Sequence, residues 1–390
     1  MVRARVTLFV VLILAIAGAA SAADQPFVHP GLLHTSQDFD RMKAMVTRGA
    51  QPWTADWRLL IANPHAQATW KPRPEPIVYR GKNPIHAQNY APFFNDVAAA
   101  YANALRWKVS GDRAYADNAV QILNDWSSTL TGISGDSDKF LASGIYGYEI
   151  ANAAEIMRGY SGWASPDFAR FQNMTLTIFY PMNHDFLIRH NGAKVDHYWA
   201  NWDLANMASM IAIGILTDRA DIYNEAVEYF KHGAGNGSIE HAVWVLYPGG
   251  LGQWQEMGRD QGHTELGVGL MGAICQMAWN QGDDLFGYDD NRFLKGAEYV
   301  AQYNLGQDVP YTTYSNSDVT QPVISAAGRG GIRPIWELIY NHYVVLKGLS
   351  APYVEQLAAK VRPEGGGGDY GPNSGGFDQL GYGTLTCTLR

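Results

Sequence analysis

GGLGQWQEMGRDQGHTELGVGLMGAICQMAWN, residues 249–280, is the stretch that says most about the fold and the function of this chain. It opens with glycines, as a loop does, and continues as an apolar segment with helical spacing. Five titratable side chains lie where the loop meets the helix: Glu256, Arg259, Asp260, His263 and Glu265. The stretch therefore predicts a long buried helix whose first turn carries polar chemistry.

Arg259 and His263 are four positions apart, so on a helix they share a face. A cation that can clamp a carboxylate thus stands one turn from a side chain that can exchange a proton near neutral pH. Glu256 and Asp260 are close enough to orient either of them. The alternative is an ion-paired helix start in which both carboxylates interact with the helix dipole. This stretch alone leaves both interpretations open.

The first residues predict export. A short basic region with Arg3 and Arg5 precedes an apolar run at 6–17, and Ala20-Ser21-Ala22 is a small-x-small cleavage site. We therefore expect a signal peptide at 1–22 and a secreted mature protein, extracellular or periplasmic, with a single domain at 23–390. The alternative is an uncleaved anchor. No later stretch is long and charge-free enough to span a membrane, so we expect no membrane partner.

Composition narrows the classes of partner. The formal net charge of -8 argues against a nucleic-acid partner, whose phosphates require a basic surface, but it allows an anionic substrate in a locally basic cleft. The frequent Trp and Tyr residues suit a carbohydrate-binding surface or a large helical core. Cys275 and Cys387 could pair in an exported protein, or Cys275 could be a buried free thiol.

A helix, a short Gly/Asp turn and a second helix recur along the chain, which is the pattern of helical hairpins. The hairpins are expected at 90–130, 199–230 and 265–303, with further helices at 36–47, 52–61, 145–160, 166–190, 334–347 and 352–361. Ser36 is expected to cap the first of these helices, and the proline-rich stretch at 64–85 to form a long surface loop. The strand-like segments are short, at 243–246 and 309–313. The sequence thus predicts an all-α protein, an (α/α) toroid or incomplete barrel. An open solenoid is the alternative, although solenoids normally keep a stricter repeat length.

The glycine-rich segment 364–382 has too much glycine for a helix. Disorder is one interpretation of such a composition. The interspersed Tyr370, Phe377, Leu380 and Tyr382 instead predict an ordered loop that packs on the body of the protein.

Further polar and aromatic residues stand at other loop-to-helix boundaries. Each could simply cap a helix or pack in the core. A toroid, however, brings such helix ends to one rim, where they could form one site. The residues in question are Gln88, Asn89, Asn201, Trp202, Tyr311, Tyr314 and Arg333.

Several stretches resemble the alginate-lyase-like family of secreted polysaccharide lyases, in its fungal and actinobacterial branch. The matching pieces are ANWDLANMASMIAIGILTD, GRDQGHTELG, NQGDDLF, AEYVAQYNLGQDVPYTTY, IRPIWELIYNHY and GGGGDYGPNSGGFDQLGYGTL. The resemblance implies a toroid and β-elimination on uronic-acid polymers such as alginate or glucuronan. Members of the family carry an EMxR element, matched here by Glu256-Met257-x-Arg259, and a catalytic Tyr two helical turns later. Leu266 stands at that position, so the usual acid/base is missing.

The resemblance and the residue types together suggest catalytic roles. Elimination removes the C5 proton of a uronate, which is acidic only when the adjacent carboxylate is neutralised. We expect Asn201, helped by Arg259 or Arg333, to neutralise it, and His263 to act as the base. Tyr314 or Tyr311 would protonate the O4 leaving group.

Substrate binding is expected from Gln88, Asn89, Trp202 and Arg333, with an anionic polysaccharide as the partner and a monomer as the acting form. The chemistry requires no cofactor, although His263 with Asp260 and Glu256 is a conceivable ion site.

Two other classes of function stay open at this point. A glycoside hydrolase on the same toroid would need two carboxylates flanking the bond, with Asp203, Asp260, Glu265 and Glu337 as candidates. A non-catalytic carbohydrate-binding protein would use the tryptophans without His263.

Overall fold

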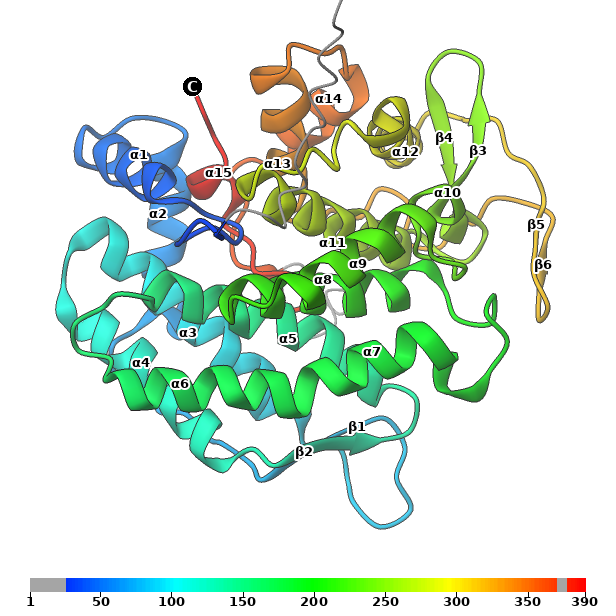
Figure 1. The fold of residues 1–390 in the computed structure, drawn as a ribbon. Coiled ribbons are helices and arrows are strands. Elements are labelled where there is room, and N and C mark those ends of the chain that lie inside the picture. Colours follow the sequence, from blue (N-terminus) through cyan, green and yellow to red (C-terminus); the bar gives the residue numbers. More distant parts are fainter. Residues whose placement is uncertain (1–25, 370–376) are drawn as a thin grey trace, which may run out of the picture.

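Helical hairpins in two layers make up the molecule (Figure 1). The computed structural model describes residues 26–369 and 377–390. The inner layer contains four helices that pack on one another in chain order: α3 (Tyr90–Ser110), α5 (Lys139–Met157), α8 (Ala200–Leu216) and α11 (Gln261–Asn280). Each of three outer helices follows the inner helix on which it packs: α4 (Arg113–Thr129), α9 (Ala220–His232) and α12 (Tyr288–Asn304).

Burial explains which helices form the inner layer. Every residue of α8 is buried, as is every residue of α5 from Ala142 to Met157. A helix that is apolar on all sides must be surrounded by protein. The outer helices are amphipathic instead, and α9 buries one face with Ile222 and Phe230 on it.

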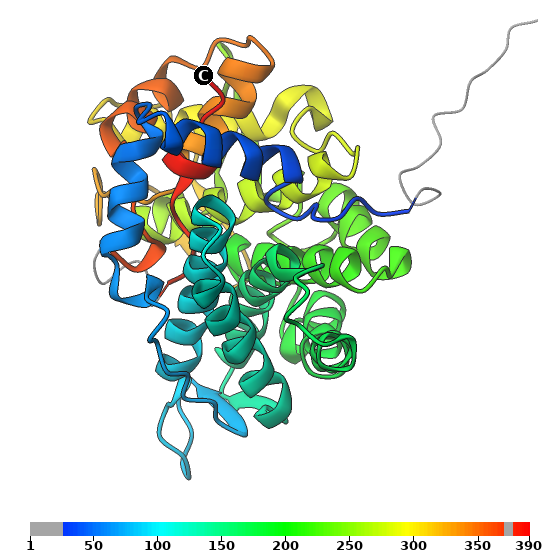
Figure 2. The same cartoon turned by 90° about the vertical axis from the view of Figure 1, so that its left-hand side faces the viewer.

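The ring closes where the two ends of the chain meet. α13 (Trp336–Tyr340) contacts α11 and α15 (Gly383–Thr386), and α15 contacts α2 (Trp53–Ala62), which reaches α3. Figure 2 shows the red α15 against the blue helices of the N-terminal part. The buried Asp56 carboxylate accepts a hydrogen bond from the backbone N–H of Leu385 at 2.7 Å. The predicted (α/α) toroid is confirmed, and the open solenoid is not.

The remaining elements are shorter. They are α1 (Ser36–Thr47), α6 (Ser165–Met174), α7 (Tyr180–Arg189), α10 (Ile239–Ala242) and α14 (Pro352–Val361). Three two-stranded sheets decorate the helices: parallel β1 (Ile77–Arg80) with β2 (Gly132–Gly135), antiparallel β3 (Val243–Tyr247) with β4 (Leu251–Trp254), and antiparallel β5 (Tyr314–Ser315) with β6 (Thr320–Gln321).

Three expectations from the sequence need correction. The strand expected at 309–313 is absent, and β5 begins one residue later at Tyr314. Helix α1 is capped by Thr35, whose side chain and that of Asp38 form a capping box, and Ser36 is its first residue. Finally, the long helix expected at 166–190 is divided by a π-helical turn at 175–179, where the backbone hydrogen bonds span five residues and not four.

The C-terminal segment is ordered where the structure describes it. Phe377, Leu380 and Tyr382 are buried, and the backbone N–H of Tyr382 donates to the carbonyl of Gly365 at 2.9 Å. This confirms packing on the body for that part, whereas Tyr370 lies outside the described residues. Both cysteines are free thiols, so the disulfide alternative is wrong.

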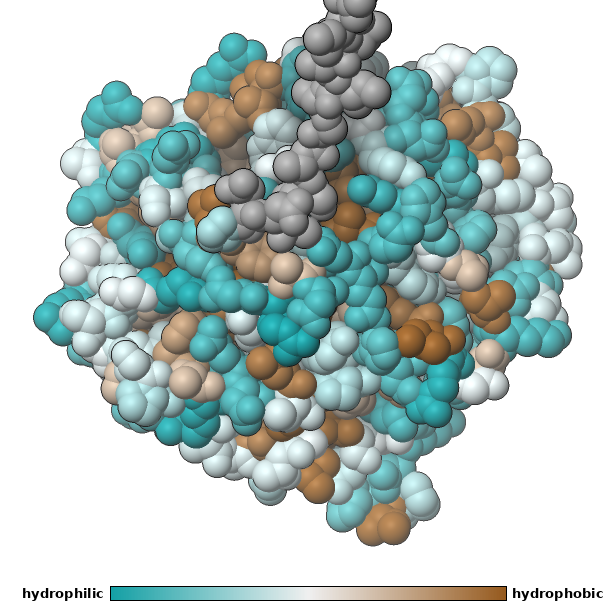
Figure 3. Space-filling view, viewed as in Figure 1, coloured by the Kyte–Doolittle hydropathy of each residue, from teal (hydrophilic) through white to brown (hydrophobic). Residues whose placement is uncertain are grey.

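The apolar residues lie mostly inside. On the face drawn in Figure 3 the hydrophobic residues form small separate patches among hydrophilic ones. Within residues 26–369 and 377–390, no helix has the length and apolarity needed to cross a membrane.

Candidate active site

A cavity of about 320 Å³ opens where α5, α8 and α11 begin. Segments far apart in the sequence contribute to its wall, including the end of β1 and the C-terminal segment. Its charged lining consists of three arginines, three aspartates and one histidine: Arg80, Arg259, Arg333, Asp138, Asp260, Asp378 and His263. Such a lining suits a ligand that carries negative charge and hydroxyl groups.

Asp260 sets the geometry of the first turn of α11. As the N-cap, its Oδ1 accepts the backbone N–H of His263 at 2.8 Å, and its Oδ2 lies 2.7 Å from His263 Nδ1. Burial acts to raise the pKa of Asp260, but the hydrogen bonds from His263 outweigh it and lower that pKa. An ionised Asp260 can accept a hydrogen bond from Nδ1–H of His263, and in a neutral imidazole with that tautomer the lone pair is on Nε2.

A buried carboxylate joins α8 to α11. Glu256 is fully buried and accepts three hydrogen bonds from Asn201, one from its backbone N–H and two from its side-chain amide, at 2.9–3.0 Å. Arg259 Nη1 donates to the same carboxylate at 2.9 Å. Burial raises the pKa of Glu256, and Arg259 opposes that shift. Glu256 thus fixes both the Asn201 amide and the Arg259 guanidinium at the cavity wall.

Arg259 is also held by an aromatic ring. Its guanidinium carbon lies 5.1 Å from the centre of the Trp199 ring, within the range of a cation–π interaction. The Arg259 side chain is 24% exposed, so one side of the cation still faces the cavity.

Arg333 and Asp378 form a second buried pair. Nη1 of Arg333 lies 3.6 Å from Asp378 Oδ2 and donates to Gln379 Oε1 at 2.6 Å. Burial raises the pKa of Asp378, although Arg333 acts against the shift. The C-terminal segment thereby contributes a carboxyl group to the cavity.

Arg80 completes the charged lining. Its guanidinium carbon lies 5.2 Å from the centre of the Tyr90 ring and 5.7 Å from that of Tyr146. Asp138, at the start of α5, stands on the same cavity wall, and burial raises its pKa.

The structure brings five of the nine sequence-predicted site residues together. Asn201, Trp202, Arg259, His263 and Arg333 all line the cavity. Leu266, at the position where the resembled family has a catalytic Tyr, also lines it, one turn beyond His263 on α11.

The two predicted acids are not part of this lining. The Tyr314 hydroxyl donates to Asn236 Oδ1 at 3.3 Å, and its ring lies 6.4 Å from that of Trp199. The Tyr311 hydroxyl donates to the backbone carbonyl of Gln321 at 3.0 Å. Only the Tyr314 ring is near Trp199, and neither hydroxyl is in the cavity lining, so the acid role of both residues stays a prediction.

Gln88 and Asn89 hold the segment that carries Arg80. Gln88 Oε1 accepts from the backbone N–H of Gly81 at 2.9 Å, and Asn89 bonds the backbone of Tyr79 and Ile77 at 2.6 and 2.9 Å. Their side chains are engaged with the backbone around β1, so their predicted contact with substrate stays a prediction.

Sequence reasoning missed Arg80, Asp138 and Asp378. Arg80 follows a short β-branched run in a segment expected to be a loop, so no helical period marked it. Asp378 could have been found, because it is one of three acidic residues in a glycine-rich tail that was expected to pack on the body, and it lies beside the aromatic Phe377.

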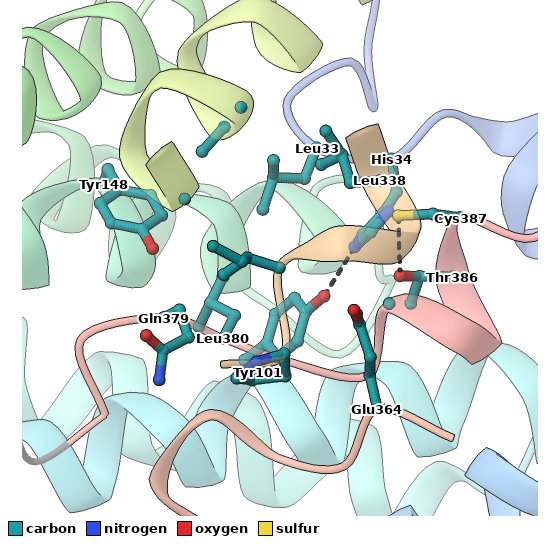
Figure 4. A pocket seen from close by; sticks show the side chains of 17 residues that line it. Leu33, His34, Tyr101, Tyr148, Leu338, Glu364, Gln379, Leu380, Thr386 and Cys387 are labelled. Atoms are coloured by element: carbon teal, nitrogen blue, oxygen red, sulfur yellow. Dashed lines mark hydrogen bonds between the residues drawn. The ribbon is translucent and has the colours of Figure 1, made fainter. Parts of the chain in front are cut away.

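A second cavity lies deeper between the layers (Figure 4). It measures about 60 Å³, which is room for a few water molecules. His34 and the Tyr101 hydroxyl meet in its wall at 2.7 Å, and Glu364 and Cys387 lie nearby. The described residues contain no cluster of His, Cys, Asp and Glu that could hold a metal ion. The small volume and the largely apolar wall favour the first cavity as the active site.

Glu265 gives a test of the electrostatics behind the cavity. Burial raises its pKa to about 8, although Arg333 opposes the shift. The folded protein therefore keeps a proton that the unfolded chain loses above about pH 4.5, so this residue costs stability as pH rises toward 8. We expect the free energy of unfolding of Glu265→Gln to equal that of the parent protein near pH 5 and to be about 3 kcal/mol larger near pH 8. Urea denaturation of both proteins at both pH values measures these free energies. The same difference between variant and parent at pH 5 and pH 8 would contradict the raised pKa of Glu265.

Comparisons with known proteins agree with this architecture. A family model described as alginate lyase matches residues 61–309. Alginate lyase A1-III from Sphingomonas species A1 is 14% identical, with 96% of this chain and 100% of that chain covered at a TM-score of 0.58. An alginate lyase from Bacteroides ovatus is 13% identical, with 93% and 100% covered at a TM-score of 0.63.

A variant of A1-III complexed with a tetrasaccharide is 15% identical, with 96% and 99% covered at a TM-score of 0.59. At these identities the likeness to solved structures establishes the fold. A search of curated protein sequences found no match.

Proposed function

Because this chain belongs to the alginate lyase family and is a polysaccharide lyase, we propose that it cleaves a mannuronate-rich alginate or a glucuronan by β-elimination. One observation carries the proposal. The imidazole of His263 lines the same cavity as three guanidinium groups, which can bind the carboxylates of successive uronate units.

The reaction redistributes one proton and one electron pair. A base removes the proton on C5 of the uronate at the cleavage site. The electron pair left on C5 forms a C4=C5 double bond, the C4–O4 bond breaks, and O4 receives a proton. The products are one chain with an unsaturated sugar at its new end and one with a free hydroxyl.

His263 is the proposed base. Its Nδ1 is bound by Asp260, so Nε2 can accept the C5 proton, and its side chain is 45% exposed on the cavity side. The negative charge that develops on the substrate carboxylate would be stabilised by Arg259 and Arg333.

Asn201 supports that stabilisation through Glu256. Both bonds from its amide nitrogen go to Glu256, which in turn holds Arg259. Its Oδ1 has no protein partner among the described residues, and this acceptor suits the O–H of a protonated uronic acid.

Which uronate epimer can be cleaved depends on whether one side chain or two side chains transfer the protons at C5 and O4. No tyrosine is among the cavity-lining residues that the structure describes, so we propose that the His263 imidazolium returns its proton to O4. One group can serve both atoms only when H5 and O4 lie on the same face of the ring. This holds for mannuronate and glucuronate, whereas guluronate, the C5 epimer, presents them on opposite faces.

A panel of polymers tests the proposal. Purified protein is incubated separately with polymannuronate, polyguluronate and glucuronan, and the ultraviolet absorbance of the new conjugated double bond is followed. We expect a rise with polymannuronate or glucuronan and none with polyguluronate. A rise with polyguluronate alone would refute the single-group mechanism.

Asp260→Asn tests how His263 is oriented. The Asn oxygen can still cap the helix, but its NH2 group cannot accept the Nδ1 proton, so the imidazole turns to the tautomer with a proton on Nε2. We expect kcat to fall on the order of 100-fold with little change in melting temperature. Asp260→Ala should lose a similar factor in kcat and also about 1 kcal/mol of stability. An unchanged kcat and pH profile in Asp260→Asn would exclude the orienting role.

The competing functions find less support. Of the four carboxylates proposed for a hydrolase, only Asp260 lines the cavity, and the family assignment is to lyases. Export, with cleavage after Ala22, a single domain at 23–390 and a monomeric state are further proposals from the sequence. N-terminal sequencing of the exported protein tests the first of them.

A further inference from the structure

A surface pocket beside the candidate active site has no assigned role. It measures about 410 Å³ and is formed by the segment that follows α2 and descends toward β1 (Figure 2). Trp70, Lys71 and Arg73 line it together with Gln67 and Thr69. An aromatic ring, two cations and hydrogen-bonding side chains are the groups that recognise a charged sugar.

The pocket is rigidly built. Trp70 Nε1 donates to Asp96 Oδ1 at 2.8 Å, and the backbone N–H of Arg73 donates to Asp96 Oδ2 at 2.7 Å. Asn118 on α4 donates to the backbone carbonyl of Trp70 at 2.8 Å. The segment is therefore fixed to two helices of the toroid, so little conformational entropy would be lost when a ligand binds to it.

The two cations are available. Lys71 and Arg73 are exposed, and neither forms an ion pair with an acidic side chain within residues 26–369 and 377–390. Asp96 lies beneath them, but it is buried and accepts hydrogen bonds from Trp70, Arg73 and Trp126. On a chain with a formal charge of -8, this pocket is a locally positive surface.

Contacts among three aromatic rings connect the pocket to the wall of the catalytic cavity. The His65 ring centre lies 4.6 Å from that of Trp70 and 4.8 Å from that of Phe377. Phe377 precedes Asp378, which lines the catalytic cavity. Two ring contacts thus join Trp70 to the segment that carries Asp378, so the two pockets are neighbours in the fold.

We propose that the pocket of Trp70, Lys71 and Arg73 is a distal subsite that binds uronate units of the polymer being cleaved. The indole face packs on a sugar ring, and the two cations bind carboxylates on neighbouring units. This inference rests on the proposed function, since the ligand is the same polysaccharide.

The double variant Lys71→Ala/Arg73→Ala tests the subsite without touching the catalytic cavity. We expect KM for polymannuronate to rise roughly fivefold to tenfold at low salt, kcat to stay unchanged, and the effect to shrink as salt screens the charges. Oligosaccharides too short to span both sites should be cleaved as by the parent protein. The matched control is Lys43→Ala/Arg48→Ala on α1, which removes the same charge elsewhere and should leave KM unchanged.

A binding measurement separates this proposal from the proposed function. Calorimetry with polymannuronate is carried out on His263→Ala protein, with and without the Lys71 and Arg73 substitutions. Weaker polymer binding in the substituted protein supports the subsite even if no elimination occurs with any polymer. Intact elimination with an unchanged KM, or equal binding of both proteins, would overturn it.

Discussion

His263→Ala should lower kcat on the preferred polymer by roughly 100- to 10,000-fold, the contribution of a positioned general base. The side chain is 45% exposed, and Asp260 is its only hydrogen-bond partner among the residues that the structure describes, so the fold should be retained. KM should change little, because the guanidinium groups that bind the carboxylates remain. Initial rates of ultraviolet absorbance measure kcat, and circular dichroism checks the fold.

His232 offers a matched control for that experiment. It is an exposed histidine in the last turn of α9, outside the lining of the cavity. His232→Ala should keep the parent kcat. If His263→Ala also kept kcat within about threefold, far less than a general base contributes, another group would have to be the base.

Arg259→Ala should lower kcat/KM on the order of 100- to 1,000-fold, the loss seen when a positioned donor to a developing anion is removed. It should also cost about 3 kcal/mol of stability, because the fully buried Glu256 would lose the one ion-pair partner that it has within the described part of the chain. Steady-state rates and urea denaturation give the two quantities. Arg259→Lys keeps the charge but not the planar fork, so its loss of activity should be intermediate.

A double variant separates chemistry from folding. In Glu256→Gln/Arg259→Ala the buried charge is gone, and most of the lost stability should return. Activity should stay low, since the cation that faces the substrate is still missing. If activity returned together with stability, Arg259 would only stabilise the fold and would have no role in catalysis.

The sequence predicted the parts of this molecule that depend on local spacing. The helical hairpins follow from apolar periodicity, and the first turn of α11 combined charges that the structure does bring to one cavity. Arg259 and His263 do share that wall, but the expected i, i+4 relation on one helix is wrong, because the extended Asp260 is the N-cap of α11 and Arg259 lies before it.

What could not be predicted depends on tertiary packing. Arg80 reaches the cavity because β1 pairs with β2, which lies more than fifty residues further along the chain. Asp378 reaches it because the C-terminal segment packs against Arg333. In the free protein the amide of Asn201 donates to Glu256, whereas the sequence suggested a substrate carboxylate as its partner. No local pattern in the sequence indicated this contact.

As a polysaccharide lyase, this protein should break its polymer by elimination and not by hydrolysis. Two signals are followed in one reaction with polymannuronate or glucuronan: new reducing ends, and unsaturated ends detected by ultraviolet absorbance. We expect one unsaturated end for every new reducing end. New reducing ends without absorbance would mean hydrolysis and would contradict this expectation.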